Sequence, residues 1–346
     1  MPLNYTLGEE IDDVVVELIR RVGQTRSPDL IREIATTAFK LVEDGASRGD
    51  LKIINSALKE MRYAFRLLAP FRAYRKVSIF GSARVQPDSP EYKLAESFAA
   101  DLVRAGFLVI TGGGPGIMEA GNRGAGDSSF GLGIRLPIEP EPNPYIRRPD
   151  RLINFKYFFT RKLVFIKESD AIVLFPGGFG TMDECFELLT LLQTGKCDPL
   201  PVVLIDPPGG GYWTDWLEFL RKRLAEPGLI DPRDLRLLTH TSDPMDAIEE
   251  IRSFYRNYHS SRYVGERLLI RLAHEPSDGE LKKWSHDFSD IIQDGGISRS
   301  DMPPEDREDP LLADLHSVSL QFTRKSFARL RELIDVMNDR SRESSP

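Results

Sequence analysis

Residues 171–184 read AIVLFPGGFGTMDE, in which a five-residue apolar run leads into three glycines and then into a helical pattern. This order predicts a buried strand at 171–175, a tight turn, and a helix at 181–194. The first backbone N–H groups of a helix have no partner within it, and the helix dipole adds partial positive charge there. We therefore expect the turn at 176–180 to bind a phosphate or a carboxylate.

The same residues allow a purely structural alternative. Thr181 could cap the helix while Glu184, three residues later, bonds back to the cap as in a capping box. A glycine-rich turn taken alone does not decide between the two interpretations, so the neighbouring segments must.

Residues 76–258 repeat the strand–turn–helix order. Apolar strands are predicted at 77–80, 107–110, 130–136, 171–175, 201–205 and 235–238, and helices at 92–104, 117–125, 158–168, 181–194, 212–225 and 244–258. A Pro-rich segment at 138–150 is expected to form a loop. The alternation is typical of an α/β protein with a Rossmann-like, doubly wound parallel sheet.

Turns that follow parallel strands meet at one edge of such a sheet. The turns GSAR (81–84), GGGPG (112–116) and PGGFG (176–180) are therefore expected to border one crevice large enough for a nucleotide. Candidate ligand-binding residues on the first two turns and the helix after them are Ser82, Gly112, Gly113, Gly114 and Glu119.

Helical extensions are expected at both ends of this core. Residues 1–73 carry three amphipathic helical patterns, and the core is assigned to 74–260. Residues 261–346 suggest helices at 265–274, 281–293 and 311–337, with an acidic, Pro-containing linker at 294–309. The simplest interpretation is that the extensions pack on the core or on a partner subunit.

Composition narrows the class of protein. The chain has 346 residues, 41% of them hydrophobic, which is enough for a sizeable core. Its 46 basic and 53 acidic residues give a net charge of −7, which argues against nucleic-acid binding. The two cysteines, Cys185 and Cys197, have no histidine nearby, so neither a disulfide framework nor a zinc site is expected. The N-terminus is acidic and no apolar run approaches 18 residues, so a cytoplasmic location without membrane contact is expected.

Several familiar sites are absent from the sequence. Both glycine motifs lack the third glycine of a dinucleotide fingerprint, and no GxxxxGK[ST], GxSxG, HExxH or PCxxC occurs. What remains near the crevice is a set of charged groups suited to anion binding and acid–base chemistry without metal or cofactor: Glu119, Arg161, Lys162, Asp183, Glu184 and Glu187.

The segment FFTRKLVFIKESDAIVLFPGGFGTMDECFELLTLLQTGK (158–196), with VSIFGSARV (77–85) and VITGGGPGIMEAGNRGA (109–125), resembles the LOG ("Lonely guy") family of phosphoribohydrolases. The family marker PGGxGTxxE is complete from Pro176 to Glu184, and an Arg-Lys pair lies about fifteen residues upstream. The resemblance covers about residues 74–258, and the FKYFFTRK and TLLQTGK segments resemble the longer bacterial branch more than the compact plant enzymes.

This resemblance implies hydrolysis of the N-glycosidic bond of nucleoside 5′-monophosphates, of the AMP or cytokinin riboside type, by a homodimer or higher homo-oligomer. By position, Arg161 and Glu184 would be catalytic. The nucleotide would be held by Lys162, Gly177, Gly178, Gly180, Thr181 and Asp183, with Thr190 approaching from the following helix.

Other functions come into question. The family is often labelled lysine decarboxylase, but the His-Lys dipeptide common in pyridoxal phosphate decarboxylases does not occur in this chain. A non-catalytic nucleotide-binding sensor or carrier of the same Rossmann-like superfamily remains the alternative. A third possibility is that the core is mainly an oligomer scaffold and that the extensions are its working part.

Overall fold

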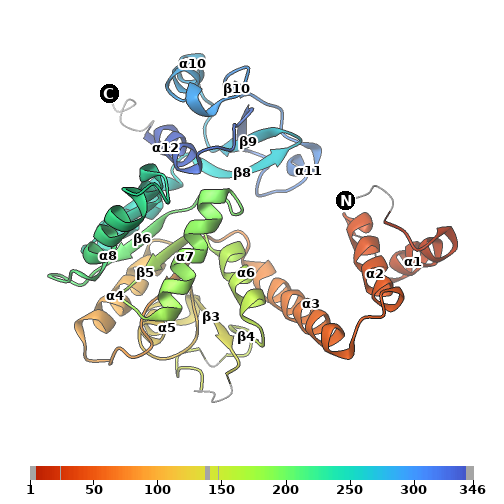
Figure 1. Cartoon of the computed structure of the whole chain (residues 1–346), viewed down its shortest axis with the longest axis horizontal. Coiled ribbons are helices and arrows are strands. Elements are labelled where there is room, and N and C mark those ends of the chain that lie inside the picture. Colours follow the sequence, from red (N-terminus) through yellow and green to blue (C-terminus); the bar gives the residue numbers. More distant parts are fainter. Residues whose placement is uncertain (1–4, 24, 137–140, 147, 340–346) are drawn as a thin grey trace. The chain divides into compact units, whose positions relative to one another are not determined.

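The computed structural model describes residues 5–23, 25–136, 141–146 and 148–339 (Figure 1). Parts of the predicted Pro-rich loop and the polar C-terminal tail lie outside the described residues. The chain divides into two compact units, residues 1–62 and 63–346, which we describe separately. The three-part division predicted at residues 73 and 260 stays a prediction.

The three predicted N-terminal helices are confirmed as α1 (Glu9–Val22), α2 (Pro28–Glu43) and α3 (Arg48–Leu68). The apolar spacing of three and four residues is the period of an α-helix, which explains why the sequence pattern was sufficient. Helices α1 and α2 pack side by side, and α3 runs on into the second unit.

A seven-stranded parallel sheet forms the centre of the second unit and confirms the predicted fold class. Its strand order is β4-β3-β2-β1-β5-β6-β7. The strands are β1 (Lys76–Phe80), β2 (Leu108–Thr111), β3 (Ser129–Ile134), β4 (Leu152–Phe155), β5 (Ala171–Leu174), β6 (Val202–Ile205) and β7 (Leu238–Thr241). The order reverses between β1 and β5, which pair in parallel register from Val77 with Ala171 to Phe80 with Leu174.

Helices cover both faces of this sheet because its strands are apolar on both sides (Figure 1). Ile79 and Val173 point into one core, with α4 (Pro90–Arg104), α5 (Ile117–Ala125) and α9 (Pro244–Phe254). Phe80 and Leu174 point into the other, with the end of α3, α6 (Phe158–Glu168), α7 (Phe179–Thr194) and α8 (Tyr212–Leu220).

Two strands differ from the sequence prediction. Strand β4 was missed, because the Pro-rich segment before it suggested a loop that continued to the next helix. Strand β7 begins at Leu238 rather than Leu235, because Asp231 caps a 3₁₀ turn over Pro232–Leu237 with a capping box.

The prediction that the C-terminal segment is helical was wrong for residues 265–274 and 311–326. An antiparallel sheet, in the order β10-β11-β9-β8, forms there instead. Its strands are β8 (Tyr258–Val264), β9 (Arg267–Leu272), β10 (Ser298–Arg299) and β11 (His316–Leu320). Helices α10 (Asp278–Asp287), α11 (Pro304–Arg307) and α12 (Phe327–Asn338) accompany it.

The missed signal was a β-hairpin. Val264 pairs with Arg267, so only two residues form the turn, and Gly265 takes the positive φ of 59° that such a turn requires. The apolar run of β9 is buried between helices and the neighbouring strands. Periodicity alone does not distinguish such a run from a helix.

The C-terminal sheet and its helices pack directly on the core. Gly195 ends α7 in the left-handed conformation, and a Cβ there would lie 1.9 Å from the Phe327 ring at the start of α12. Arg331 of α12 reaches Glu250 of α9 at 2.6 Å. This segment is therefore part of the structure that supports α7.

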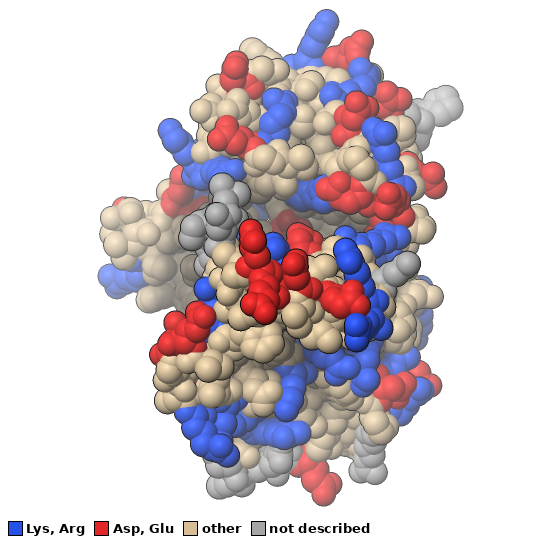
Figure 2. All heavy atoms as spheres, turned by 90° about the vertical axis from the view of Figure 1, so that its right-hand side faces the viewer, with Lys and Arg blue, Asp and Glu red and all other residues tan. Residues whose placement is uncertain are grey.

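Charges of both signs are spread over the face drawn in Figure 2, and neither sign covers it. Among the helices of the described residues, none is both long enough and apolar enough to cross a membrane.

Candidate functional site

A pocket of about 800 Å³ opens where the strand order reverses, at the carboxyl ends of β1 and β5. At such a point the loops that follow the two neighbouring strands run to opposite sides of the sheet and leave a crevice between them. Doubly wound sheets bind their ligands in this crevice. The turn after β1 lines one side and the turn after β5 the other. The lining residues include Gly81, Ser82, Arg84, Met118, Phe158, Arg161, Gly177, Gly178, Gly180, Thr181, Asp183, Glu184 and Tyr212.

Helix α7 begins at this pocket without a side-chain cap. Its N-cap is Gly178, and among the described residues no side chain accepts a hydrogen bond there. The capping-box alternative is therefore wrong, because Thr181 lies inside the first turn instead of preceding it. The Thr181 hydroxyl packs on Gly177, where a Cβ would lie 2.0 Å from its Oγ1.

Two glycines of the turn have no packing reason to be glycine. A Cβ on Gly178 or Gly180 would meet no described atom within 4 Å, and neither residue has a positive φ. The missing side chains leave open space beside the first N–H groups of α7. The turn thus has the form expected for close approach of an anionic ligand.

Arg161 is held in place by its surroundings. Its Nε donates to the Leu132 carbonyl at 2.7 Å, and its guanidinium lies 5.0 Å from the centre of the Phe165 ring. Gly112 makes room for it, since a Cβ there would lie 2.6 Å from Nη2. With Nε bonded to Leu132, the terminal nitrogen Nη1 faces Glu184.

Glu184 faces Arg161 at 3.8 Å between Oε1 and Nη1. Both side chains are about nine-tenths buried. The distance is too long for a hydrogen bond, so both groups keep capacity for a ligand. Burial raises the pKa of Glu184 to about 7, against the opposing effect of Arg161 and Lys162. Burial also lowers the pKa of Arg161, which Glu184 opposes.

Lys162 pairs with other carboxylates. Its Nζ lies 2.7 Å from Asp183 and 2.6 Å from Glu187. Burial lowers the pKa of Lys162, but the hydrogen bonds to Asp183 and Glu187 outweigh it and the net direction is upward. Asp183 lines the pocket, whereas Lys162 is not one of its lining residues and reaches it only through Asp183.

The structure does not bring every predicted residue to the pocket. Glu119 accepts a hydrogen bond from Tyr92 at 3.2 Å and does not line the pocket. Thr190 bonds the Phe186 carbonyl at 2.8 Å and lines a separate small apolar pocket. Thr190 lies about three helical turns beyond the start of α7, which places it too far along the helix to reach the pocket.

The GGGPG turn supports the pocket from behind. Asn143 ties it down by bonding the Gly113 and Gly114 carbonyls, each at 3.0 Å. Gly116 lies against the turn after β1, where a Cβ would be 2.3 Å from the Ser82 carbonyl. Of the three predicted turns, two line the pocket in this chain and the third fixes Arg161 and Ser82.

Tyr212 is a lining residue that the sequence analysis missed. It begins α8, and its hydroxyl donates to the Gly177 carbonyl at 2.5 Å. Burial raises the pKa of Tyr212, so the hydroxyl stays a donor at neutral pH. Its position after β6, the next strand beyond β5 in the sheet, was the available signal.

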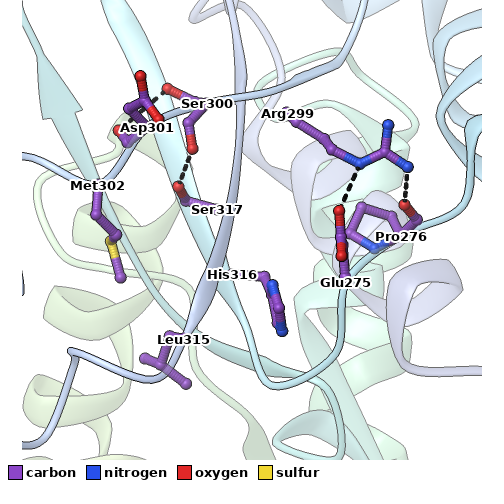
Figure 3. A pocket seen from close by; sticks show the side chains of 9 residues that line it. All are labelled: Glu275, Pro276, Arg299, Ser300, Asp301, Met302, Leu315, His316 and Ser317. Carbon is purple, nitrogen blue, oxygen red and sulfur yellow. Dashed lines mark hydrogen bonds and ion pairs between the residues drawn. The ribbon is translucent and has the colours of Figure 1, made fainter.

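A second pocket, of about 390 Å³, lies in the C-terminal sheet (Figure 3). Several of its polar groups are engaged with one another: Arg299 reaches Glu275 and the Pro276 carbonyl, and Ser317 donates to the Ser300 carbonyl. None of its described lining residues belongs to a glycine turn. Within the described residues, no group of three or more His, Cys, Asp or Glu side chains could hold a metal ion.

Residues 106–251 match the family described as "Possible lysine decarboxylase". A cytokinin riboside 5′-monophosphate phosphoribohydrolase of Mycobacterium tuberculosis is 28% identical over 160 residues, which are 45% of this chain and 82% of that protein. The resemblance to the LOG family is confirmed. Whether the chain falls in the longer bacterial branch stays a prediction.

Other relatives match over less of their length. A pyrimidine/purine nucleotide 5′-monophosphate nucleosidase of Escherichia coli is 33% identical over 152 residues, and the match spans 39% of this LOG-like chain and 32% of that protein. A solved molybdenum cofactor binding protein of Rippkaea orientalis shares 20% identity with a TM-score of 0.36, covering 52% of this chain and 96% of that one. At this TM-score the likeness supports no conclusion about function.

The raised pKa of Glu184 predicts a pH-dependent stability. Between the pKa of an ordinary glutamate and about 7, the folded state holds a proton that the unfolded state has lost, so this group lowers the free energy of unfolding as pH rises. Glu184→Gln removes that titration. In urea titrations, the wild type should therefore lose stability relative to the variant as the pH rises. The difference in their free energies of unfolding should change by on the order of 2 kcal/mol in favour of the variant between pH 5 and pH 8. A pH-independent difference would contradict the raised pKa.

Proposed function

We propose that this protein hydrolyses the N-glycosidic bond of nucleoside 5′-monophosphates, releasing the free base and ribose 5-phosphate. The observation that carries the proposal is the buried pair of Arg161 and Glu184, facing each other beside the uncapped start of α7. The names of the relatives, phosphoribohydrolase and nucleotide 5′-monophosphate nucleosidase, support it.

In this proposal the phosphate occupies the start of α7. The turn Gly177–Gly180 supplies backbone N–H groups, the helix dipole favours negative charge, and the missing side chains of Gly178 and Gly180 leave room. Ser82 lies across the pocket on the turn after β1 and offers a second polar contact.

Glu184 would act at the anomeric carbon. Breaking the bond between C1′ and the base nitrogen builds positive charge on the sugar, which a nearby carboxylate stabilises. Water supplies hydroxide to C1′, and its proton leaves with the base. A carboxylate with a pKa near 7 can accept that proton from water and pass it on at neutral pH.

Arg161 would stabilise the negative charge on the departing base or the phosphate. A guanidinium stays charged at working pH and presents paired donors, and here it is already oriented by Leu132 and Gly112. No reorganisation of the charge is then needed during the reaction. Lys162 and Asp183, which are paired with each other, would complete the nucleotide site.

A homodimer is part of the proposal. Phe158, Phe159 and Leu163 on α6 are half exposed, and Phe179 at the start of α7 is 97% exposed. Phe158 and Phe179 also line the pocket. A second copy packing on these apolar side chains would cover the pocket mouth and exclude water from the site.

The alternative function is a sensor or carrier that binds nucleotides without cleaving them. Such a protein has no need for an acid–base group tuned to neutral pH opposite a buried guanidinium, which is what favours the enzyme. Incubation with common nucleoside monophosphates separates the two, because only the enzyme produces free base.

Removing either member of the pair should abolish turnover. We expect Glu184→Gln and Arg161→Ala to lower kcat for AMP by about 10²–10⁴-fold while circular dichroism shows an intact fold. Adenine release is measured by chromatography. The control is Glu218→Gln, which changes an exposed glutamate of α8 outside the pocket and should leave kcat unchanged. A folded Glu184→Gln protein that still cleaves AMP at the wild-type rate would contradict the catalytic role of Glu184.

The rate should rise with pH. If the ionised Glu184 is the active form, kcat for AMP increases from pH 5.5 to 8. The midpoint reports the pKa of Glu184 in the complex with AMP, whereas the value of about 7 belongs to the unliganded site. The quantity to measure is kcat, because the phosphate of free AMP itself titrates at about pH 6 and this titration would also change kcat/KM. A kcat that falls over this range would show that the protonated carboxyl is the active form instead.

Tyr212 should act as a positioning residue. Tyr212→Phe removes the hydrogen bond to Gly177, worth about 0.5–1.5 kcal/mol, and loosens the phosphate-binding turn. We expect KM for AMP to rise by about 2–10-fold with little change in kcat. Tyr74→Phe, at an exposed tyrosine outside the pocket, should change neither constant. A loss confined to kcat would contradict the positioning role.

A further inference from the structure

The helical hairpin formed by α1 and α2 turns apolar faces outward. On α1 the side chains of Ile11, Val14, Leu18 and Val22 are 48–91% exposed, and their spacing of three and four puts them on one stripe. On α2 the exposed apolar side chains are Leu30, Ile31, Ile34, Phe39 and Val42. Of the described residues in these two helices, only Val15 and Thr36 are buried.

A hairpin with two buried side chains gains little from its own packing. Most helical stability in proteins comes from burying an amphipathic face against another element. Soluble monomers rarely leave contiguous apolar surface of this kind open. The exposed stripes therefore need a partner.

The charges of α1 identify what kind of partner fits. Its acidic residues Glu9, Glu10, Asp12 and Asp13 lie in the first half, whereas Arg20 and Arg21 lie in the last turn. Glu17 lies between them and pairs with Arg21 at 2.9 Å, but this pair is exposed and therefore weak, so Arg21 keeps donors for a carboxylate of another chain. Glu10 and Arg21 are separated by about three helical turns, so they flank the same edge of the apolar stripe. The helix is thus acidic at one end and basic at the other along a single face.

Such a helix is complementary to itself in the antiparallel direction. When two copies of α1 lie antiparallel, Ile11 comes near Val22 of the other copy, Val14 near Leu18, and Glu10 beside Arg21. In a parallel two-fold arrangement the edge that carries Glu10 and Arg21 would lie on opposite sides of the seam in the two copies, so the attraction between Glu10 and Arg21 would be lost. An antiparallel pair with equivalent contacts on both sides is what a two-fold axis generates.

We propose that α1 and α2 form a self-association surface for a second copy of this chain, with the two hairpins joining as an antiparallel four-helix bundle. Short-looped hairpins with outward apolar stripes are the units from which such bundles are built. This surface is distinct from the α6 face proposed to cover the pocket, and it does not depend on the proposed enzyme activity.

A membrane surface fits these helices less well. Residues 9–43 contain eight acidic and five basic residues, a net charge of −3. Helices that lie on anionic membranes carry lysine and arginine on their polar face. A protein partner with matching charge is therefore favoured over a lipid surface.

Charge reversal provides a test specific to self-association. In the full-length protein, Glu10→Lys and Arg21→Glu should each weaken association by at least about tenfold in sedimentation velocity, because each places like charges opposite one another twice. An equimolar mixture of the two variants should regain association, since the lysine introduced in one chain then meets the glutamate introduced in the other.

Matched controls isolate the interface from effects on helix stability. Glu91→Lys reverses a charge in the first turn of α4, and Lys93→Glu reverses an exposed charge in the same helix. Both should associate as the wild type does, and circular dichroism should show equal helix content in all variants. The proposal fails if either α1 variant associates as the wild type does, or if the equimolar mixture does not regain association. It also fails if the variants change only the melting temperature, because the apolar stripes would then be covered by the same chain.

Discussion

The position of the Arg161 guanidinium is the constraint on which the site depends. It is held between the Leu132 carbonyl in β3, the space left by Gly112 directly after β2, and the Phe165 ring on its own helix. Three elements of the parallel sheet and its helices thus fix one positive charge at the edge where ligands bind. The Glu184 carboxylate on α7 then meets that charge across the pocket.

Burial sets the chemistry of this pair. Opposite charges at 3.8 Å attract, but both groups are largely removed from water, and the cost of desolvation exceeds that attraction for each of them. The result is a carboxyl group that changes protonation near neutral pH beside a cation that does not. Keeping such a pair costs folding stability, which is typical of sites arranged for a reaction.

Helix α7 links the pocket to the C-terminal segment. Its first turn forms the proposed phosphate site, and Gly195, which follows its last residue, lies against Phe327 of α12. The C-terminal sheet therefore contributes to the placement of Glu184 through packing on the same helix. The N-terminal hairpin has a different part in the proposals, in which its apolar stripes bind a second copy of the chain.

The sequence by itself determined the parallel α/β core, the three N-terminal helices, and the convergence of Arg161 and Glu184 near a glycine turn. Those features follow from local periodicity and from a motif whose residues lie close together in the sequence. Only the tertiary structure decided that Glu119 and Thr190 lie away from the pocket, that Tyr212 belongs to it, and that residues 258–272 form a hairpin. The physical reason is that burial and contact between distant segments select among local conformations of similar energy, and an apolar run such as that of β9 does not reveal its neighbours.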